Sequence, residues 1–196
     1  MKRTPLSFPQ CASSFYEVLP AQINSLVLRR ATADDVPFLR QLYRETRDEE
    51  SAVVGWPEVQ WLKFCNSQFN LQHMQYTRQF SKAEFLIIME GPAQVGRLYV
   101  DGAGDNVHVI DIALMAARRG AGIGSALLSD IKVRAKSINK PVTLHLLLTN
   151  VRARRLYERL GFVATVAPTG MYIGMRWSDR DGVVPSEARE LGGHSG

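Results

Sequence analysis

Cysteine is scarce in this sequence, and long apolar runs are absent from it. Among the 196 residues only Cys11 and Cys65 are cysteines, and no CxxC or Cys/His spacing typical of a metal site occurs. Because a disulfide framework for a chain of this size would need more cysteines, we expect two reduced thiols and no bound metal. No stretch of about 18 apolar residues occurs, so we expect no association with a membrane.

The N-terminus also lacks the features of a secretory signal. The first twenty residues begin with basic side chains but contain no continuous apolar segment, so we expect a cytoplasmic protein. Apolar residues make up 45% of the chain and charged residues 22%. These values are typical of a globular fold and argue against disorder over the whole length.

Positive charge is concentrated in one part of the chain. The formal net charge is +5, and residues 118–159 contain ten basic and two acidic side chains, a local net charge of +8 that leaves −3 for the remainder. Such a segment suits an anionic ligand, either a nucleic acid or a phosphorylated cofactor. Because no nucleic-acid-binding motif is present, we expect a phosphorylated cofactor and no nucleic acid.

The hydrophobic pattern predicts one α/β domain between two less regular ends. Residues 1–25 form an N-terminal extension of uncertain order, residues 26–178 the domain, and residues 179–196 a polar C-terminal tail. The predicted elements follow the order β-α-α-β-β-β-α-β-α-β-β. This order favours a mixed, largely antiparallel sheet flanked by helices, because a Rossmann fold would instead repeat βαβ units.

A glycine-rich segment, Arg118–Ser125, connects a predicted strand over 107–114 to a predicted helix that begins near Ile123. Glycine lets the backbone curl so that several N–H groups point at one anion, and the start of a helix adds partial positive charge. The segment lacks the lysine of a P-loop, and Ser125 or Leu127 stands where GxGxxG needs its third glycine. It therefore predicts a pyrophosphate site of a different kind.

Two motifs on neighbouring predicted elements resemble a known family. Arg119-x-x-Gly122-x-Gly124 resembles the coenzyme A signature of the GNAT superfamily of N-acetyltransferases, and residues 111–114, Asp-Ile-Ala-Leu, resemble the strand end that precedes it. Residues 150–162, with the pattern NxxAxxLYExLGF, resemble the second signature of the family. The resemblance is strong over residues 107–163 and weak over residues 26–41.

The resemblance implies a GNAT-like fold with splayed central strands, and acetyl-CoA as co-substrate. It implies an N-acetyltransferase that moves the acetyl group directly to a primary amine of a small molecule or a protein. No cysteine lies in either signature, so an acetyl-cysteine intermediate is not expected. The alternative is a domain that binds acyl-CoA as a sensor without transfer. Family members often form homodimers, which makes a homodimer one candidate assembly.

The resemblance also assigns residues to the acetyl-CoA site. The strands over 107–114 and 142–148 would splay apart, and the pantetheine arm would lie between them. Asn150 would orient that arm or the start of the following helix. The backbone of the strand end formed by Ile112, Ala113 and Leu114 would pair with the arm. The glycine-rich loop would bind the pyrophosphate through its N–H groups. The residues of this loop are Arg119, Gly120, Ala121, Gly122, Ile123, Gly124 and Ser125.

Tyr157 and Asp111 are the candidate catalytic residues that the resemblance implies. Tyr157 would be the general acid that protonates the departing thiolate, because a phenol and a thiol have ordinary pKa values close enough for proton transfer. Asp111 would be the base that takes the proton of the amine, with His108, Glu45 or a chain of waters as alternatives. Strand alternation predicts that His108 and Asp111 point to opposite faces.

The acceptor is not identified by any motif. In this family it is bound by the first helices and the last hairpin, here roughly residues 38–80 and 166–177. One hypothesis is a cationic acceptor attracted by the acidic residues in this region, and the alternative is that they lie on a solvated helix end. These residues are Glu45, Asp48, Glu49, Glu50 and Glu58.

Overall fold

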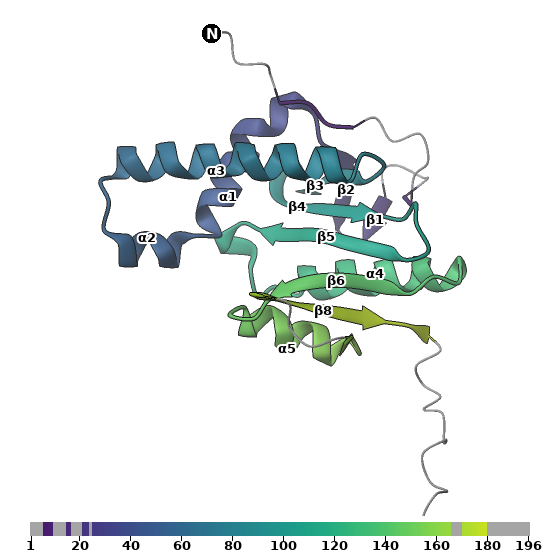
Figure 1. Ribbon diagram of the computed structural model, residues 1–196. Coiled ribbons are helices and arrows are strands. Elements are labelled where there is room, and N and C mark those ends of the chain that lie inside the picture. The colour runs from purple at the N-terminus through teal and green to yellow at the C-terminus, as the bar shows by residue number, and fades with distance from the viewer. Residues whose placement is uncertain (1–5, 10–14, 17–20, 24, 166–169, 180–196) are drawn as a thin grey trace, which may run out of the picture.

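The computed structural model describes residues 6–9, 15–16, 21–23, 25–165 and 170–179. Over these residues the strands form one eight-stranded sheet with the order β1-β2-β3-β4-β5-β6-β8-β7 (Figure 1). All neighbouring strands are antiparallel except β5 and β6. The strands are β1 Ala21–Ile23, β2 Leu26–Arg30, β3 Glu84–Glu90, β4 Ala93–Asp101, β5 Val107–Leu114, β6 Val142–Leu147, β7 Val163–Ala164 and β8 Tyr172–Trp177.

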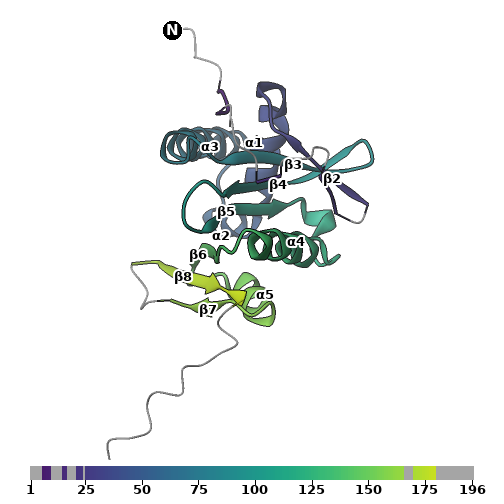
Figure 2. The same cartoon turned by 90° about the vertical axis from the view of Figure 1, so that its right-hand side faces the viewer.

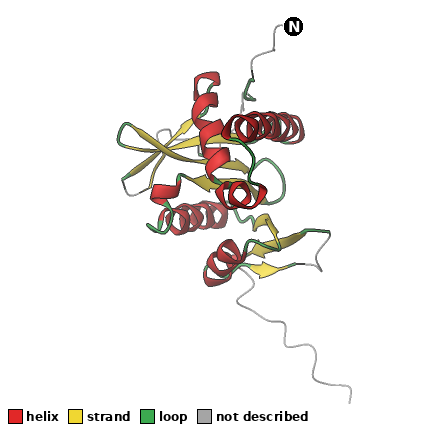
Figure 3. Cartoon of the chain, turned by 90° about the vertical axis from the view of Figure 1, so that its left-hand side faces the viewer, coloured by secondary structure: helices red, strands yellow, loops and turns green. Residues whose placement is uncertain are grey.

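Helices cover both faces of the sheet. Helices α1 and α3 pack on one face, α4 packs on the other, and α5 lies beside β6 and β8 (Figures 1, 2 and 3). Within the described part of the chain, no helix combines the length and apolar character that crossing a bilayer requires. The α-helices are α1 Val36–Glu45, α2 Asp48–Val54, α3 Glu58–Gln79, α4 Ile123–Ser137 and α5 Val151–Arg159, with 3-10 turns at Ala33–Asp35 and Ala116–Arg118.

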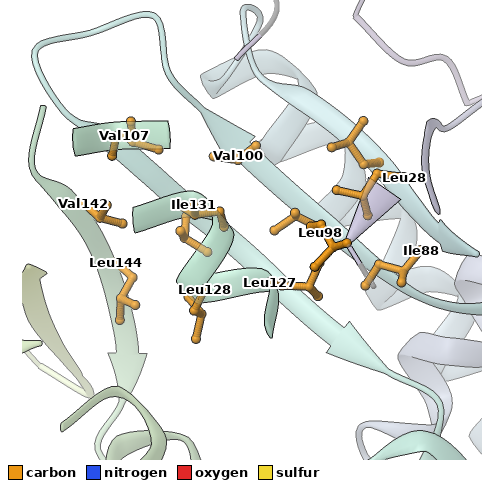
Figure 4. Packing of buried hydrophobic residues seen from close by; sticks show 14 of the residues in the cluster. Leu28, Ile88, Leu98, Val100, Val107, Leu127, Leu128, Ile131, Val142 and Leu144 are labelled. Carbon is orange, nitrogen blue, oxygen red and sulfur yellow. The ribbon is translucent and has the colours of Figure 1, made fainter. Parts of the chain in front are cut away.

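The larger core cluster lies between α4 and the sheet. Leu127, Leu128 and Ile131 recur at helical spacing on α4 and are at most 1% exposed. They pack against alternate residues of the strands, among them Leu98 and Leu144 (Figure 4). This packing holds α4, and therefore the loop that precedes it, against the sheet. The prediction of a mixed, largely antiparallel sheet flanked by helices is confirmed.

Strands β5 and β6 separate along their length. Their parallel pairing covers only Val107–Val109 of β5 with Val142–Leu144 of β6, so the rest of the two strands, up to Leu114 and Leu147, has no ladder between them. The β5–α4–β6 crossover allows this parallel pair in a sheet that is otherwise antiparallel. The predicted splay of the central strands is confirmed, and it leaves one edge of β5 open (Figure 1).

A β-bulge in β5 resets its alternation. Asp111 pairs with Tyr99 of β4, and Val109 with Val100, so Ile110 is the extra residue between them. His108 stacks on Phe80, which follows α3 directly. Asp111 binds Arg97, which in turn contacts Gln72 of α3. The prediction that His108 and Asp111 point to opposite faces is therefore wrong, because a bulge lets both point toward α3.

The packed domain begins before residue 26, which is the first residue of the domain predicted from the sequence. Tyr16 is fully buried in the cluster under α4, and β1 pairs with β2 at the edge of the sheet. Leu6 and Phe8 pack on the cluster between the sheet and α3. The remaining residues of the predicted extension, and the tail from 180 onward, lie outside the described residues.

Candidate active site

The glycine-rich loop has the backbone that an anion site needs. Gly120 and Gly122 have φ values of +84° and +81°, in the left-handed region that favours glycine. Gly122 is the N-cap residue of α4, and no side chain caps that helix start. A Cβ at Gly122 would meet no heavy atom within 4 Å. The first turn of α4 therefore has N–H groups without a side-chain cap, and such groups can bind an anion.

The side chain of Arg119 connects this loop to the rest of the domain through hydrogen bonds. Its Nε donates to the carbonyl oxygen of Leu114 at 2.9 Å, and its Nη2 donates to that of Glu45 at 3.0 Å. The carboxylate of Glu45 accepts a hydrogen bond from the backbone N–H of Ala116 at 2.9 Å. Arg119 thus ties the end of β5 to the end of α1. Glu45, one alternative for the base, is engaged in the same junction.

Helix α5 packs beside the loop and begins at Asn150. The Oδ1 atom of Asn150 accepts a hydrogen bond from the N–H of Ala153 at 3.0 Å, so this side chain caps α5. Of the two roles expected for Asn150, the structure shows the one at the helix start. Arg152 extends toward Gly120, where a Cβ would lie 3.5 Å from its Nη2, and adds positive charge beside the loop.

The open edge of β5 is supported from the other side by β4. Ile112, Ala113 and Leu114 pair with Leu98, Arg97 and Gly96. A Cβ at Gly96 would collide with the carbonyl oxygen of Ala113, so the two strands can approach this closely only with glycine at that position. The backbone of this strand end is thereby fixed toward β4 and free on the side of β6.

Asp111 forms a mostly buried ion pair that the sequence analysis did not predict. Nη2 of Arg97 lies 2.5 Å from Oδ2 of Asp111 and 3.0 Å from Oε1 of Gln72. The side chains of Arg97 and Asp111 are 4% and 17% exposed. Burial alone would lower the pKa of Arg97, but the neighbouring Asp111 outweighs it and raises that pKa above its ordinary value. The guanidinium of Arg97 is therefore held charged, and the ion pair fixes the orientation of the two side chains.

Tyr157 lies on the face of the sheet opposite to Asp111. Its ring packs against the cluster under α4 and lies edge-on to Phe162, with centroids 5.8 Å apart. Burial, followed by the charge of Asp111, raises the pKa of Tyr157 to about 12. The charge of Asp111 thus acts on the phenol of Tyr157, although the two side chains belong to opposite faces of the sheet.

His108 stays a candidate beside Asp111. Its Nδ1 lies 3.0 Å from Oγ1 of Thr143, and its ring centroid lies 5.3 Å from that of His145. Burial, followed by the charge of His145, lowers the pKa of His108. The imidazole is therefore held in its neutral form near pH 7, the form that accepts a proton.

Several residues near Asp111 were missed by the sequence analysis. Arg97 donates hydrogen bonds to both Gln72 and Asp111, and Gly96 sets the spacing of β4 and β5. The sequence does single out Arg97, because this charged residue stands in the middle of the largely apolar segment that forms β4. Gln72 carries no comparable signal, since one glutamine on a long helix is ordinary.

The site thus combines a parallel strand pair that opens toward Leu114 with a glycine-rich helix start. Comparison with known proteins identifies the family. The family described as Acetyltransferase (GNAT) family matches residues 39–162. The chain belongs to the GNAT acetyltransferase family. No curated protein sequence matches it significantly.

Solved structures agree with this fold. The PaiA N-acetyltransferase from Thermoplasma acidophilum, in complex with coenzyme A, is 16% identical with a TM-score of 0.60, over 79% of this chain and 99% of that one. An acetyltransferase from Thermus thermophilus is 15% identical with a TM-score of 0.59, over 80% and 98% of the two chains. A Corynebacterium glutamicum structure described as histone acetyltransferase HPA2 and related acetyltransferase is 22% identical with a TM-score of 0.54, over 78% and 95%.

Proposed function

We propose that this protein transfers an acetyl group from acetyl-CoA directly to a primary amine. The observation that carries the proposal is the opening between β5 and β6, beside the glycine-rich start of α4. Family membership supports acetyl-CoA as the co-substrate. The structure of one neighbour in complex with coenzyme A supports it further.

The residues of this chain fit the parts of coenzyme A. The free edge of residues 112–114 offers backbone N–H and C=O groups to the two amides of the pantetheine arm. The backbone of residues 119–125 would hold the pyrophosphate, and Arg152 adds positive charge beside Gly120. When bound, acetyl-CoA supplies an activated acyl group whose leaving group is a thiolate.

In the transfer itself, the amine nitrogen forms a bond to the acetyl carbon and the carbon–sulfur bond breaks. Asp111 takes the proton that the amine loses, and Arg97 positions the Asp111 carboxylate. Tyr157 holds its proton at working pH and donates it to the departing sulfur. The Asp111 charge raises the pKa of Tyr157, so neutralising Asp111 makes Tyr157 a stronger acid at the moment when the thiolate needs a proton.

Release of free thiol from acetyl-CoA in the presence of amines tests the proposal. We expect thiol release that depends on both protein and amine, with one N-acetylated product for each thiol. Coenzyme A binding without thiol release from any amine would contradict transfer and favour the acyl-CoA sensor instead. A melting-temperature shift on adding coenzyme A measures the binding separately.

A further inference from the structure

The surface beside Asp111 is rich in aromatic side chains. Phe80 stacks on His108 with ring centroids 5.7 Å apart, and the ring of His145 follows at 5.3 Å from that of His108. Burial raises the pKa of Tyr76, and the nearby Asp111 and Tyr172 raise it further. We call the five rings the aromatic patch: Tyr76, Phe80, His108, His145 and Tyr172.

Strand pairing explains why these rings share one face. Val142, Leu144 and Leu146 of β6 are buried in the cluster under α4, so the alternate residues His145 and Leu147 point to the side of α3. Tyr172 is the register partner of Leu147. Because register partners in an antiparallel ladder point to the same face, Tyr172 and Leu147 lie side by side next to His145.

An exposed apolar surface extends the aromatic patch at the end of β6. Leu147 is 40% exposed, Tyr172 48% and Met171 70%. The N–H of Leu148 donates to the carbonyl oxygen of Met171 at 2.9 Å, which joins these residues across the last pair of strands. Large apolar side chains gathered at the surface mark a binding site more often than scattered ones do.

Of the five carboxylates that suggested a cationic acceptor, Glu45 and Glu50 have partners within the protein, and so has Asp111. Asp111 is paired with Arg97, and the carboxylate of Glu45 accepts a backbone hydrogen bond. Glu50 forms an ion pair with Arg47 at 2.5 Å. Arg97 thus compensates the charge of Asp111, and the side chains gathered next to Asp111 are mainly apolar and aromatic.

We infer that the acceptor is a primary monoamine with an aromatic or apolar body, such as an arylalkylamine. Its body lies on the aromatic patch and its nitrogen lies beside Asp111, an arrangement that rests on the proposed function. An aromatic body gains ring contacts with Tyr172 and apolar contact with Leu147. A polyamine would place a second ammonium, and an amino acid a carboxylate, on apolar side chains, and each would lose hydration without gaining a partner.

The test compares three amines that share parts of one structure. Phenethylamine carries the aromatic body alone, phenylalanine adds a carboxylate to that body, and putrescine replaces the body with a second ammonium. Thiol release from acetyl-CoA is measured with each amine at saturating acetyl-CoA. We expect kcat/KM for phenethylamine to exceed that for either of the others by about tenfold or more, because each of them desolvates a charge.

A pair of variants assigns the effect to the patch. Tyr172→Ala should raise the KM for phenethylamine about three- to tenfold, the value of one aromatic contact, and leave the KM for acetyl-CoA unchanged. Leu71→Ala is the control, because Leu71 is 60% exposed on α3 and lies outside the patch. Melting curves establish that both variants fold.

The outcomes separate the inference from the proposed function. Faster transfer to putrescine or phenylalanine than to phenethylamine would overturn the monoamine inference while acetyl transfer stands. An equal effect of Tyr172→Ala and Leu71→Ala on the KM for phenethylamine would overturn the role of the patch. No thiol release with any amine, with coenzyme A binding retained, would overturn both proposals.

Discussion

Replacing Gly122 by alanine tests the pyrophosphate site with a minimal change. Gly122 has a φ of +81°, and a Cβ there meets no heavy atom within 4 Å. In the ligand-free protein the cost is therefore the left-handed backbone alone, about 1–2 kcal/mol. Gly55, at the end of α2, has a φ of +64° and equally open surroundings. Gly55→Ala thus has similar strain outside the loop, and the two variants should lose similar stability without ligand.

Coenzyme A should distinguish these two variants. At a concentration of one hundred times its Kd, a ligand stabilises the folded state by about 2.7 kcal/mol. In a domain of this size that corresponds to a rise in Tm of roughly 5–10 °C. A methyl group at position 122 occupies the space that the phosphate would enter, and binding weakened about a hundredfold would leave only about 0.4 kcal/mol of stabilisation.

Differential scanning fluorimetry with and without coenzyme A measures both quantities. We expect the full rise in Tm for the parent and for Gly55→Ala, and almost none for Gly122→Ala. An equal rise in the two variants would refute the reasoning, because it would show that the backbone around Gly122 does not approach the pyrophosphate. A large difference in Tm without ligand would show that the strain was not matched.

Three further predictions follow from named contacts. Tyr157→Phe should lower kcat about 10²- to 10⁴-fold while the coenzyme A-induced rise in Tm is unchanged; a kcat within twofold, with chemistry rate-limiting, would make Tyr157 structural. Asn150→Ala should lower the free energy of unfolding by about 1 kcal/mol, because it removes the cap of α5; urea unfolding measures it, and an unchanged midpoint would contradict the cap. Burial alone would raise the pKa of Asp35, but hydrogen bonds from Arg29 and Thr32 outweigh it and hold that pKa below its ordinary value. The stabilisation of the fold by ionised Asp35 is therefore full above its pKa in the unfolded chain, about 3.9. It is lost as the pH falls through the lower pKa that Asp35 has in the folded protein. Asp35→Asn should flatten the loss of stability on acidification, and an equally steep loss would contradict this.

The glycine-rich loop and the start of α5 could be predicted because their local chemistry is unusual. Glycine at positions 120 and 122 allows the positive φ values of the loop, and Asn150 is a residue type that caps helices well. Both the loop and the start of α5 can therefore be predicted from residue types alone. The parallel strand pair follows from the crossover through α4. The opening between β5 and β6 came from the family resemblance alone, since no residue pattern indicates where a parallel ladder stops.

The surroundings of Asp111 could not be predicted because they depend on contacts between distant segments. The extra residue Ile110 reverses strand alternation, and bulges leave no reliable pattern in an apolar strand. Arg97 meets Gln72 only after α3 packs on the sheet. Helix α2 was likewise not predicted, because its seven residues are too few to show an apolar period.

Acetyl transfer across the opening between β5 and β6 is most directly tested by product analysis with three forms of the protein. Acetyl-CoA and phenethylamine are incubated with the parent, Tyr157→Phe and Asp111→Asn, and free thiol and N-acetylated amine are both quantified. We predict equal amounts of thiol and acetylated amine with the parent, and a large loss of both with each variant while coenzyme A still raises the Tm. Parent-level product from both variants, or coenzyme A binding without product from the parent with any amine, would contradict transfer at this site.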